Sequence, residues 1–241
     1  MRRALAALLV LVLWAAPGCG GDDDSRLTVF AAASLQDVLP RIDPDPRYVF
    51  GGSSQLAAQL RDGAPGDVFV SASEPLAAEL AAAEVLERPV VVASNRLVVV
   101  VPRSGSRVRA VSDLVEPGVK LVIGAEGVPA GDYAREALPA AGLQAALGNV
   151  VSLEDDAKGV VAKVALREAD AGVAYATDAR IAADRVRAIP IPEAAQPAIA
   201  YAAAVIERSP EPASARAYID RLVGREGRAA FREQGFLPPR P

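Results

Sequence analysis

The chain has 241 residues, of which 51% are hydrophobic and 23% charged, so it is long enough to bury one large core or two smaller ones. Its net charge of −4 gives no sign of nucleic-acid binding. It contains no histidine, the commonest general base and transition-metal ligand, and a single cysteine, which excludes an intrachain disulfide and a cysteine cluster for zinc.

The N-terminal segment has the pattern of a secretory signal. Two arginines precede a continuous apolar run over residues 4–16, which is too short to span a bilayer as a mature helix. Small residues then lead to Cys19 in a pattern that resembles a bacterial lipobox, with Ala16 where a leucine is usual. We expect a signal peptide over 1–18, and a lipid-bearing Cys19 and flexible, acidic tether over 19–26. The alternative is an ordinary signal peptide with an incidental cysteine.

From residue 27 onward, short apolar strands alternate with alanine-rich helical patterns. The first series predicts strands at 27–30, 48–50, 67–70 and 97–101 and helices at 35–42, 54–62 and 74–83. The second series predicts strands at 121–123, 150–151, 171–175 and 199–206 and helices at 132–141, 157–167, 178–184, 212–223 and 227–234. Such alternation is typical of mostly parallel sheets with helices on both faces.

Two long apolar segments, 97–101 and 199–206, bracket the second series and predict two crossings between two α/β lobes. We therefore assign 27–98 plus 201–241 to lobe 1, which holds both ends of the mature chain, and 99–200 to an inserted lobe 2. Nothing in the pattern indicates an exposed apolar stripe for a dimer face, so we expect a monomer.

The residues that follow the predicted strands are small, hydroxylated or glycine, with no Lys or Arg until the helices are under way. They include Ser34, Ser53, Ala130, the acidic run 154–156 and Tyr175. In doubly wound sheets, ligands bind beyond the carboxyl ends of strands, where helix N-termini point. Neutral hydroxyls and free backbone N–H groups suit a small, fully deprotonated oxyanion that accepts every hydrogen bond offered. A protonated ligand suits the site less well, because no acceptor is evident for its proton.

Each of these positions also has a purely structural interpretation. Ser34 and Ser53 can be helix N-caps, and Pro129 can be the ordinary first residue of a helix. The carboxylates at 154–156 can complement a helix dipole, and Tyr175 can be a core residue with a satisfied hydroxyl. The residues taken one at a time leave both interpretations open.

Several segments together resemble the periplasmic molybdate-binding proteins of ABC importers. In chain order they are TVFAAASLQDVL, FGGSSQLAAQLRDGAPGDVFVSA, VPAGDYAREAL and AGVAYATDA, and AAFREQGF resembles the C-terminal helix and tail of that family. The resemblance covers 27–236. It implies two Rossmann-like lobes of the type II periplasmic binding protein class, which close on an anion without enzymatic chemistry.

The resemblance also implies a set of ligand-binding positions. They are Ser34 and Ser53 through their hydroxyls, Ala130 and Asp156 through backbone N–H groups, and Tyr175 through its hydroxyl. The ligand is expected to be molybdate or tungstate, bound as the whole oxyanion, so that no residue ligates the metal directly and no cofactor is needed. The expected partners are the permease subunits of an ABC importer and, through the lipid on Cys19, the membrane surface facing the periplasm or the outside.

Two departures from the family pattern bear on this site. Many members carry an apolar residue where this chain has Asp156, and a carboxylate beside a dianion repels it unless it turns away. The stretch 37–48 is shorter than usual and holds three prolines, so the first helix must end early. A reshaped pocket would favour another small oxyanion or a carboxylate as ligand.

Two other classes of function remain as alternatives: a lipoprotein that senses the anion and signals to a partner, and an exported enzyme. The enzyme is disfavoured by the lack of histidine, of a Gly-x-Ser-x-Gly elbow and of a metal-ligand cluster. The adjacent carboxylates Asp155 and Asp156 would point apart on a helix, which makes them a poor acid and base pair.

Overall fold

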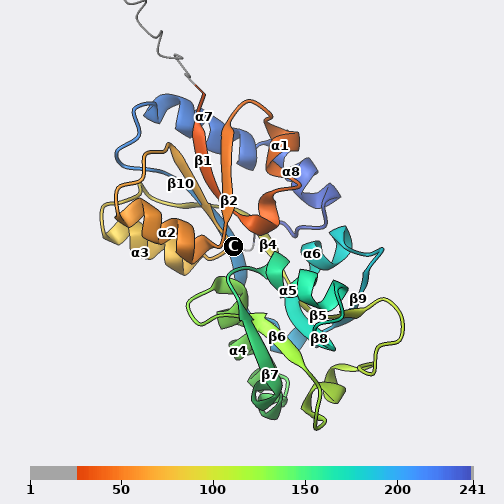
Figure 1. The fold of residues 1–241 in the computed structure, drawn as a ribbon. Helices are drawn as coiled ribbons and strands as arrows, with labels where there is room; N and C mark the ends of the chain where they lie inside the picture. The colour runs from red at the N-terminus through yellow and green to blue at the C-terminus, as the bar shows by residue number, and fades with distance from the viewer. Residues whose placement is uncertain (1–25, 240–241) are drawn as a thin grey trace, which may run out of the picture.

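The computed structural model describes residues 26–239 and shows two α/β lobes, each built on a five-stranded sheet (Figure 1). The expected α/β architecture is therefore confirmed. The expected signal peptide, Cys19 and nearly all of the tether lie outside the described residues.

The sheet of the first lobe has the strand order β2-β1-β3-β10-β4. Its strands are β1 (Thr28–Ala32), β2 (Arg47–Gly51), β3 (Val68–Ser71), β4 (Val90–Asn95) and β10 (Ile199–Val205). Its helices are η1 (Ala33–Leu35), α1 (Leu39–Ile42), α2 (Ser53–Arg61), α3 (Glu74–Ala82), α7 (Pro212–Val223) and α8 (Arg225–Glu233). β1 pairs in parallel with β2 and β3, whereas β10 runs antiparallel to β3 and β4.

The sheet of the second lobe has the order β7-β6-β8-β5-β9. Its strands are β5 (Leu97–Pro102), β6 (Leu121–Gly124), β7 (Val150–Glu154), β8 (Ala171–Tyr175) and β9 (Val186–Pro190). Its helices are η2 (Val111–Val115), α4 (Pro129–Ala140), η3 (Gln144–Asn149), α5 (Ala157–Ala165), α6 (Ala176–Ile181) and η4 (Glu193–Ala195). As in the first lobe, the consecutive βα units pair in parallel and the crossing strand β5 pairs antiparallel on both sides.

The chain passes between the two sheets twice. Arg96 alone separates β4 from β5, and the segment 191–198 returns the chain from β9 to β10. The side chain of Gln196 ties the two crossings together, because it accepts the backbone N–H of Leu97 and donates to the Leu97 carbonyl, both at 2.8 Å. The lobes therefore meet at a narrow, hydrogen-bonded junction.

Most predicted elements are present, and the differences have local causes. The single helix predicted over 35–42 is split into η1 and α1, and Asp43, which precedes Pro44, is extended at φ −149° and ψ 111°. The sequence analysis does not predict β4 or β9. Both are edge strands with one neighbour: β9 mixes exposed with buried residues, and the apolar run of β4 is only four residues long and is followed by Ser94 and Asn95.

The apolar core is continuous through the junction. Ala93 of β4, Leu97 of β5, Tyr175 of β8 and Tyr201 of β10 belong to one cluster of buried residues that extends into both lobes. A second cluster, which includes Phe30 and the helix residues that face it, lies under α2 and α3. Figure 1 shows these two helices together on one side of the first lobe, away from α1 and α8.

Gly131 in the first turn of α4 is required by close packing of that helix on β6. A Cβ atom there would overlap the backbone carbonyl oxygens of Gly124 and Ala125, which cannot rotate away. We expect Gly131→Ala to lower the free energy of unfolding by about 1–3 kcal/mol, because α4 must shift from the sheet. Urea denaturation measures this, and Gly148→Ala, whose Cβ would meet nothing within 4 Å, is the matched control. An equal effect of the two substitutions would contradict the packing argument.

Candidate anion-binding site

A small pocket lies between the lobes, at the carboxyl ends of β1, β2 and β8. Its volume of about 20 Å³ suits a ligand of only a few atoms. It is lined by Ala32, Ala33, Ser34, Gly51, Gly52, Ser53, Ala72, Val128, Pro129, Ala130, Asp156, Ala157 and Tyr175. The structure thus brings together all five positions that the sequence singled out, from both lobes, and the lining itself contains no Lys or Arg.

The two serines of the first lobe are buried hydroxyls that neighbouring groups hold in place. The Ser34 Oγ lies 2.9 Å from the hydroxyl of Tyr201, and the Ser53 Oγ accepts the backbone N–H of Ala72 at 3.0 Å. Neither serine is a helix N-cap, since that position belongs to Ala32 in η1 and to Gly52 in α2. The N-cap interpretation of both serines is therefore wrong, and neither hydroxyl oxygen accepts a capping hydrogen bond from a helix N–H.

Tyr175 ends β8 and brings a hydroxyl from the second lobe. The residue is 2% exposed, and its hydroxyl has no hydrogen-bond partner among residues 26–239. Among the described residues, therefore, Tyr175 is not a core tyrosine with a satisfied hydroxyl, and that interpretation is wrong. Burial raises the pKa of Tyr175 well above 10, so the phenol keeps its proton and acts as a donor.

Three helix N-termini also point at the pocket. Ser53 is the first residue of α2, Pro129 the first of α4 and Ala157 the first of α5, and all three line the cavity. Because Pro129 has no N–H, Ala130 contributes the first backbone donor of α4. The first-turn N–H groups lack intrahelical partners, and the helix dipoles add partial positive charge, so the pocket attracts an anion without a formal cation.

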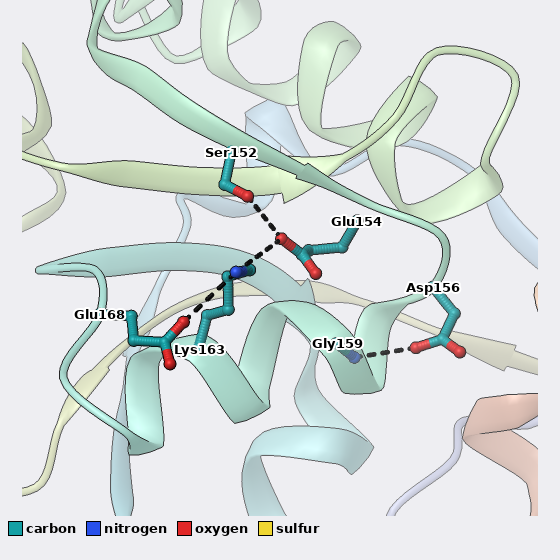
Figure 2. A network of polar contacts seen from close by, with 6 residues as sticks. All are labelled: Ser152, Glu154, Asp156, Gly159, Lys163 and Glu168. Atoms are coloured by element: carbon teal, nitrogen blue, oxygen red, sulfur yellow. Dashed lines mark hydrogen bonds and ion pairs between the residues drawn. The ribbon is translucent and has the colours of Figure 1, made fainter.

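Two carboxylates of the acidic run 154–156, those of Glu154 and Asp156, are engaged within the second lobe (Figure 2). Asp156 is the N-cap of α5, with its Oδ1 accepting the N–H of Gly159 at 2.8 Å. Glu154 accepts a hydrogen bond from Ser152 at 2.7 Å and lies 3.8 Å from the Nζ of Lys163. The interpretation that these carboxylates complement a helix N-terminus is confirmed for Asp156, whose charge faces the positive end of α5.

Polar contacts close the rim of the pocket from lobe to lobe. The Lys158 ammonium donates to Asp37 at 2.9 Å and to Gln36 at 3.2 Å, and the Ser54 hydroxyl donates to the backbone carbonyl of Gly127. In the same region, Gly52 lies so close to Asp155 that a Cβ atom would overlap the Asp155 carbonyl oxygen. The two lobes are thus in direct contact around the pocket.

The sequence analysis does not single out three polar residues near the site. Tyr201, in β10, is hydrogen-bonded to Ser34, from which it is 167 positions away in the chain, and Asn95, in β4, donates to Tyr201. Asp178 is 3% exposed and neither of its carboxyl oxygens has a partner in the described chain. Burial raises the pKa of Asp178 to about 7, partly offset by Lys158. No local motif marks Tyr201 and Asn95, because only the packing of distant segments brings them to Ser34, whereas Asp178 lies in the first turn after Tyr175 and only its burial without a partner depends on the fold.

Comparison with known proteins gives consistent matches. Residues 27–237 match the family described as bacterial extracellular solute-binding protein. The molybdate-binding protein ModA of Mycobacterium tuberculosis is 35% identical over 224 residues, covering 88% of this chain and 85% of that protein. ModA of Escherichia coli is 33% identical over 233 residues, covering 89% and 90%. The solved periplasmic molybdate-binding protein of Azotobacter vinelandii aligns with a TM-score of 0.79 at 20% identity, covering 89% of this chain and all of that one, which shows a shared fold.

The buried carboxyl of Asp178 predicts a pH-dependent stability. Between pH 4 and 7 the folded protein keeps a proton that the unfolded chain releases, so the free energy of unfolding falls as the pH rises, by at most about 4 kcal/mol. Asn cannot ionise, so Asp178→Asn should match the wild type near pH 4 and exceed it above pH 7. Urea denaturation from pH 4 to pH 8 measures the difference. A difference independent of pH would show that Asp178 is not the group that titrates.

Proposed function

The chain belongs to the bacterial extracellular solute-binding proteins, a family of binding proteins and not of enzymes, and we propose that it captures molybdate, and tungstate equally, between its two lobes. The observation that carries the proposal is the pocket lined by neutral donors from both lobes, with the buried Tyr175 hydroxyl left without a partner in the described chain. Relatives that cover most of the chain bear the name molybdate-binding protein, which supports the same ligand.

The chemistry of the donors favours a fully deprotonated oxyanion. Backbone N–H groups can only donate, and the phenol of Tyr175 stays protonated. A tetrahedral dianion accepts hydrogen bonds on every oxygen, so its charge is stabilised by oriented dipoles without an opposing ion. Molybdate and tungstate are nearly equal in size and should bind alike. Sulfate is smaller and would leave donors unpaired, at about 1–3 kcal/mol for each.

We further propose that the protein delivers its anion to the permease subunits of an ABC importer, acting as an exported monomer with a lipid on Cys19. Within residues 26–239, none of the helices has both the length and the apolar character needed to cross a membrane. On this proposal, the lobes open and close about the two crossings, with lobe 1 formed by 27–98 plus 201–241 and lobe 2 by 99–200. Closure adds Ala130, the backbone N–H of Asp156 and the Tyr175 hydroxyl to Ser34 and Ser53.

Thermal unfolding of the soluble form that starts at Gly20 tests the ligand. A ligand that binds only the folded state raises the midpoint, by roughly 5–10 °C when molybdate or tungstate stands at a hundred times its Kd. Sulfate and phosphate at the same concentration should give smaller shifts. A larger shift with one of these, or with a carboxylate, would replace the proposed ligand, and no shift with any anion would remove the proposal.

The substitution Ser53→Ala tests which residues form the binding site. Loss of one hydrogen bond to a charged ligand should weaken molybdate binding roughly 10- to 100-fold, measured by calorimetry. Ser214→Ala is the control, because Ser214 lies in α7 and its hydroxyl contacts only Glu211 at 3.4 Å in the described structure. Unchanged affinity in the Ser53 variant would contradict the proposed site and leave molybdate as the proposed ligand.

Gly52→Ala tests closure. The backbone of Gly52, at φ −62° and ψ 133°, accepts alanine, so lobe 1 should fold normally, but the new methyl group would overlap the Asp155 carbonyl oxygen when the lobes meet. We expect molybdate to reduce the radius of gyration of the wild type in small-angle X-ray scattering and not that of the variant, which should also bind more weakly. Gly51→Ala is the neighbouring control, since its Cβ would meet only side chains of lobe 1. Full compaction of the Gly52 variant would contradict this closure geometry.

A further inference from the structure

We propose that Asn95 and Tyr201 are positioning residues that force the Ser34 hydroxyl to donate to the ligand, and that this arrangement makes the pocket select oxyanions that carry no proton. The proposal rests on the function proposed above and assigns the discrimination to two residues beyond the pocket lining.

The orientation of the Asn95 side chain is set by the crossing itself. Its Oδ1 accepts the backbone N–H of Arg96 at 2.9 Å, and a backbone N–H can only donate, so this atom must be the oxygen. The amide nitrogen therefore faces the other way, where it donates to the Thr177 Oγ1 at 3.0 Å and to the Tyr201 hydroxyl at 3.3 Å. Asn95 is 1% exposed, so solvent does not compete for these bonds.

The direction of the next bond follows from counting protons. The Tyr201 hydroxyl oxygen accepts from Asn95, and it has one proton of its own. Its other hydrogen-bond partner in the described structure is the Ser34 Oγ at 2.9 Å, which is the one acceptor available there for the buried phenol proton, so we infer that Tyr201 donates to Ser34. Burial holds the pKa of Tyr201 far above its usual value, so the phenol does not lose this proton near neutral pH.

The proton of the Ser34 hydroxyl is therefore free to point into the pocket. Its oxygen already accepts from Tyr201, and the residue is 4% exposed and lines the cavity. Ser53 is in the same state, since its oxygen accepts the N–H of Ala72. With the protonated Tyr175, both lobes present O–H protons to the ligand.

A protonated oxyanion is disfavoured in such a pocket for a simple reason. The O–H group of the ligand would face the O–H groups of the protein, and each serine oxygen already has a donor bound to it. Each serine oxygen keeps only one free lone pair, and its own proton points into the same pocket, so the ligand proton competes with protein protons and forms a poorer hydrogen bond. Asn95, which holds the Tyr201 hydroxyl in place, also donates to Thr177 of the second lobe. The direction of the Ser34 proton therefore depends on how the two lobes meet at the crossing.

A double-mutant cycle tests whether Tyr201 acts through Ser34. Calorimetry gives the molybdate affinity of the wild type, Tyr201→Phe, Ser34→Ala and the double variant. We expect Tyr201→Phe to weaken binding about 3- to 10-fold and Ser34→Ala roughly 10- to 100-fold. The double variant should bind within about twofold of Ser34→Ala, because the tyrosine has no effect once the serine hydroxyl is gone. Multiplied losses would overturn the proposal.

Matched variants separate an effect on ligand binding from a general loss of protein stability. Tyr218→Phe removes the hydroxyl of another buried tyrosine of lobe 1, whose one hydrogen-bond partner among residues 26–239 is the Tyr48 hydroxyl at 3.3 Å, and it should leave affinity unchanged. If Tyr201→Phe does not fold, Asn95→Ala serves instead, because it removes the donor to Tyr201 and leaves both hydroxyls in place. The same non-additivity with Ser34→Ala is expected, and additive losses would again overturn the proposal.

The selectivity readout uses sulfate and phosphate, two tetrahedral oxyanions of similar size. At pH 6 phosphate keeps at least one proton and sulfate keeps none, so the ratio of their affinities, measured by competition with molybdate, reports on the proton of the ligand. We expect the wild type to favour sulfate and Tyr201→Phe to reduce that preference severalfold, because Ser34 is then free to accept. An unchanged ratio of affinities would overturn the proposed role of Asn95 and Tyr201 without contradicting molybdate binding. A wild type that binds no oxyanion would overturn the proposed function as well.

Discussion

The crossing at Arg96 is the constraint from which the rest of the arrangement follows. One residue carries the chain from β4 in the first sheet to β5 in the second, so the end of β4 and the start of β5 must lie next to each other at that point. Gln196 bonds both backbone groups of Leu97 and holds the return crossing beside the first. The carboxyl ends of the parallel strands of both lobes then face one another, and the helices that follow them start around one small pocket.

Anion capture in a chain of net charge −4 depends on dipoles and on where the carboxylates are placed. No Lys or Arg lines the pocket, and the nearest acidic group, Asp156, caps its own helix. Lys158 lies at the rim, where it pairs with Asp37 of the other lobe. A formal cation is therefore used to hold the lobes together, while neutral N–H and O–H groups remain available for the ligand.

Neutral donors also explain how the site can distinguish ligands of equal size. Hydroxyls are ambiguous, because each can donate or accept, and an ambiguous hydroxyl would tolerate a protonated ligand. In this structure the ambiguity is removed by groups behind the pocket: the N–H of Ala72 for Ser53, and Tyr201 with Asn95 for Ser34. Burial of these groups keeps water from offering an alternative partner.

The sequence by itself determined the alternation of strands and helices and the two α/β lobes, because these follow from local patterns, and its resemblance to a known family indicated the five positions that line the pocket. Ser34 and Ser53 directly follow strands, and Pro129 makes Ala130 the first donor of its helix. The edge strands β4 and β9 and the partners of Ser34 were decided by the tertiary structure. Tyr201 meets Ser34 across 167 positions, and Asp178 is buried without a partner among the described residues, through packing of segments far apart in the chain. Local patterns depend on neighbours within a few residues, whereas the direction of a hydrogen bond in the site depends on which distant groups the fold brings within 3 Å or so.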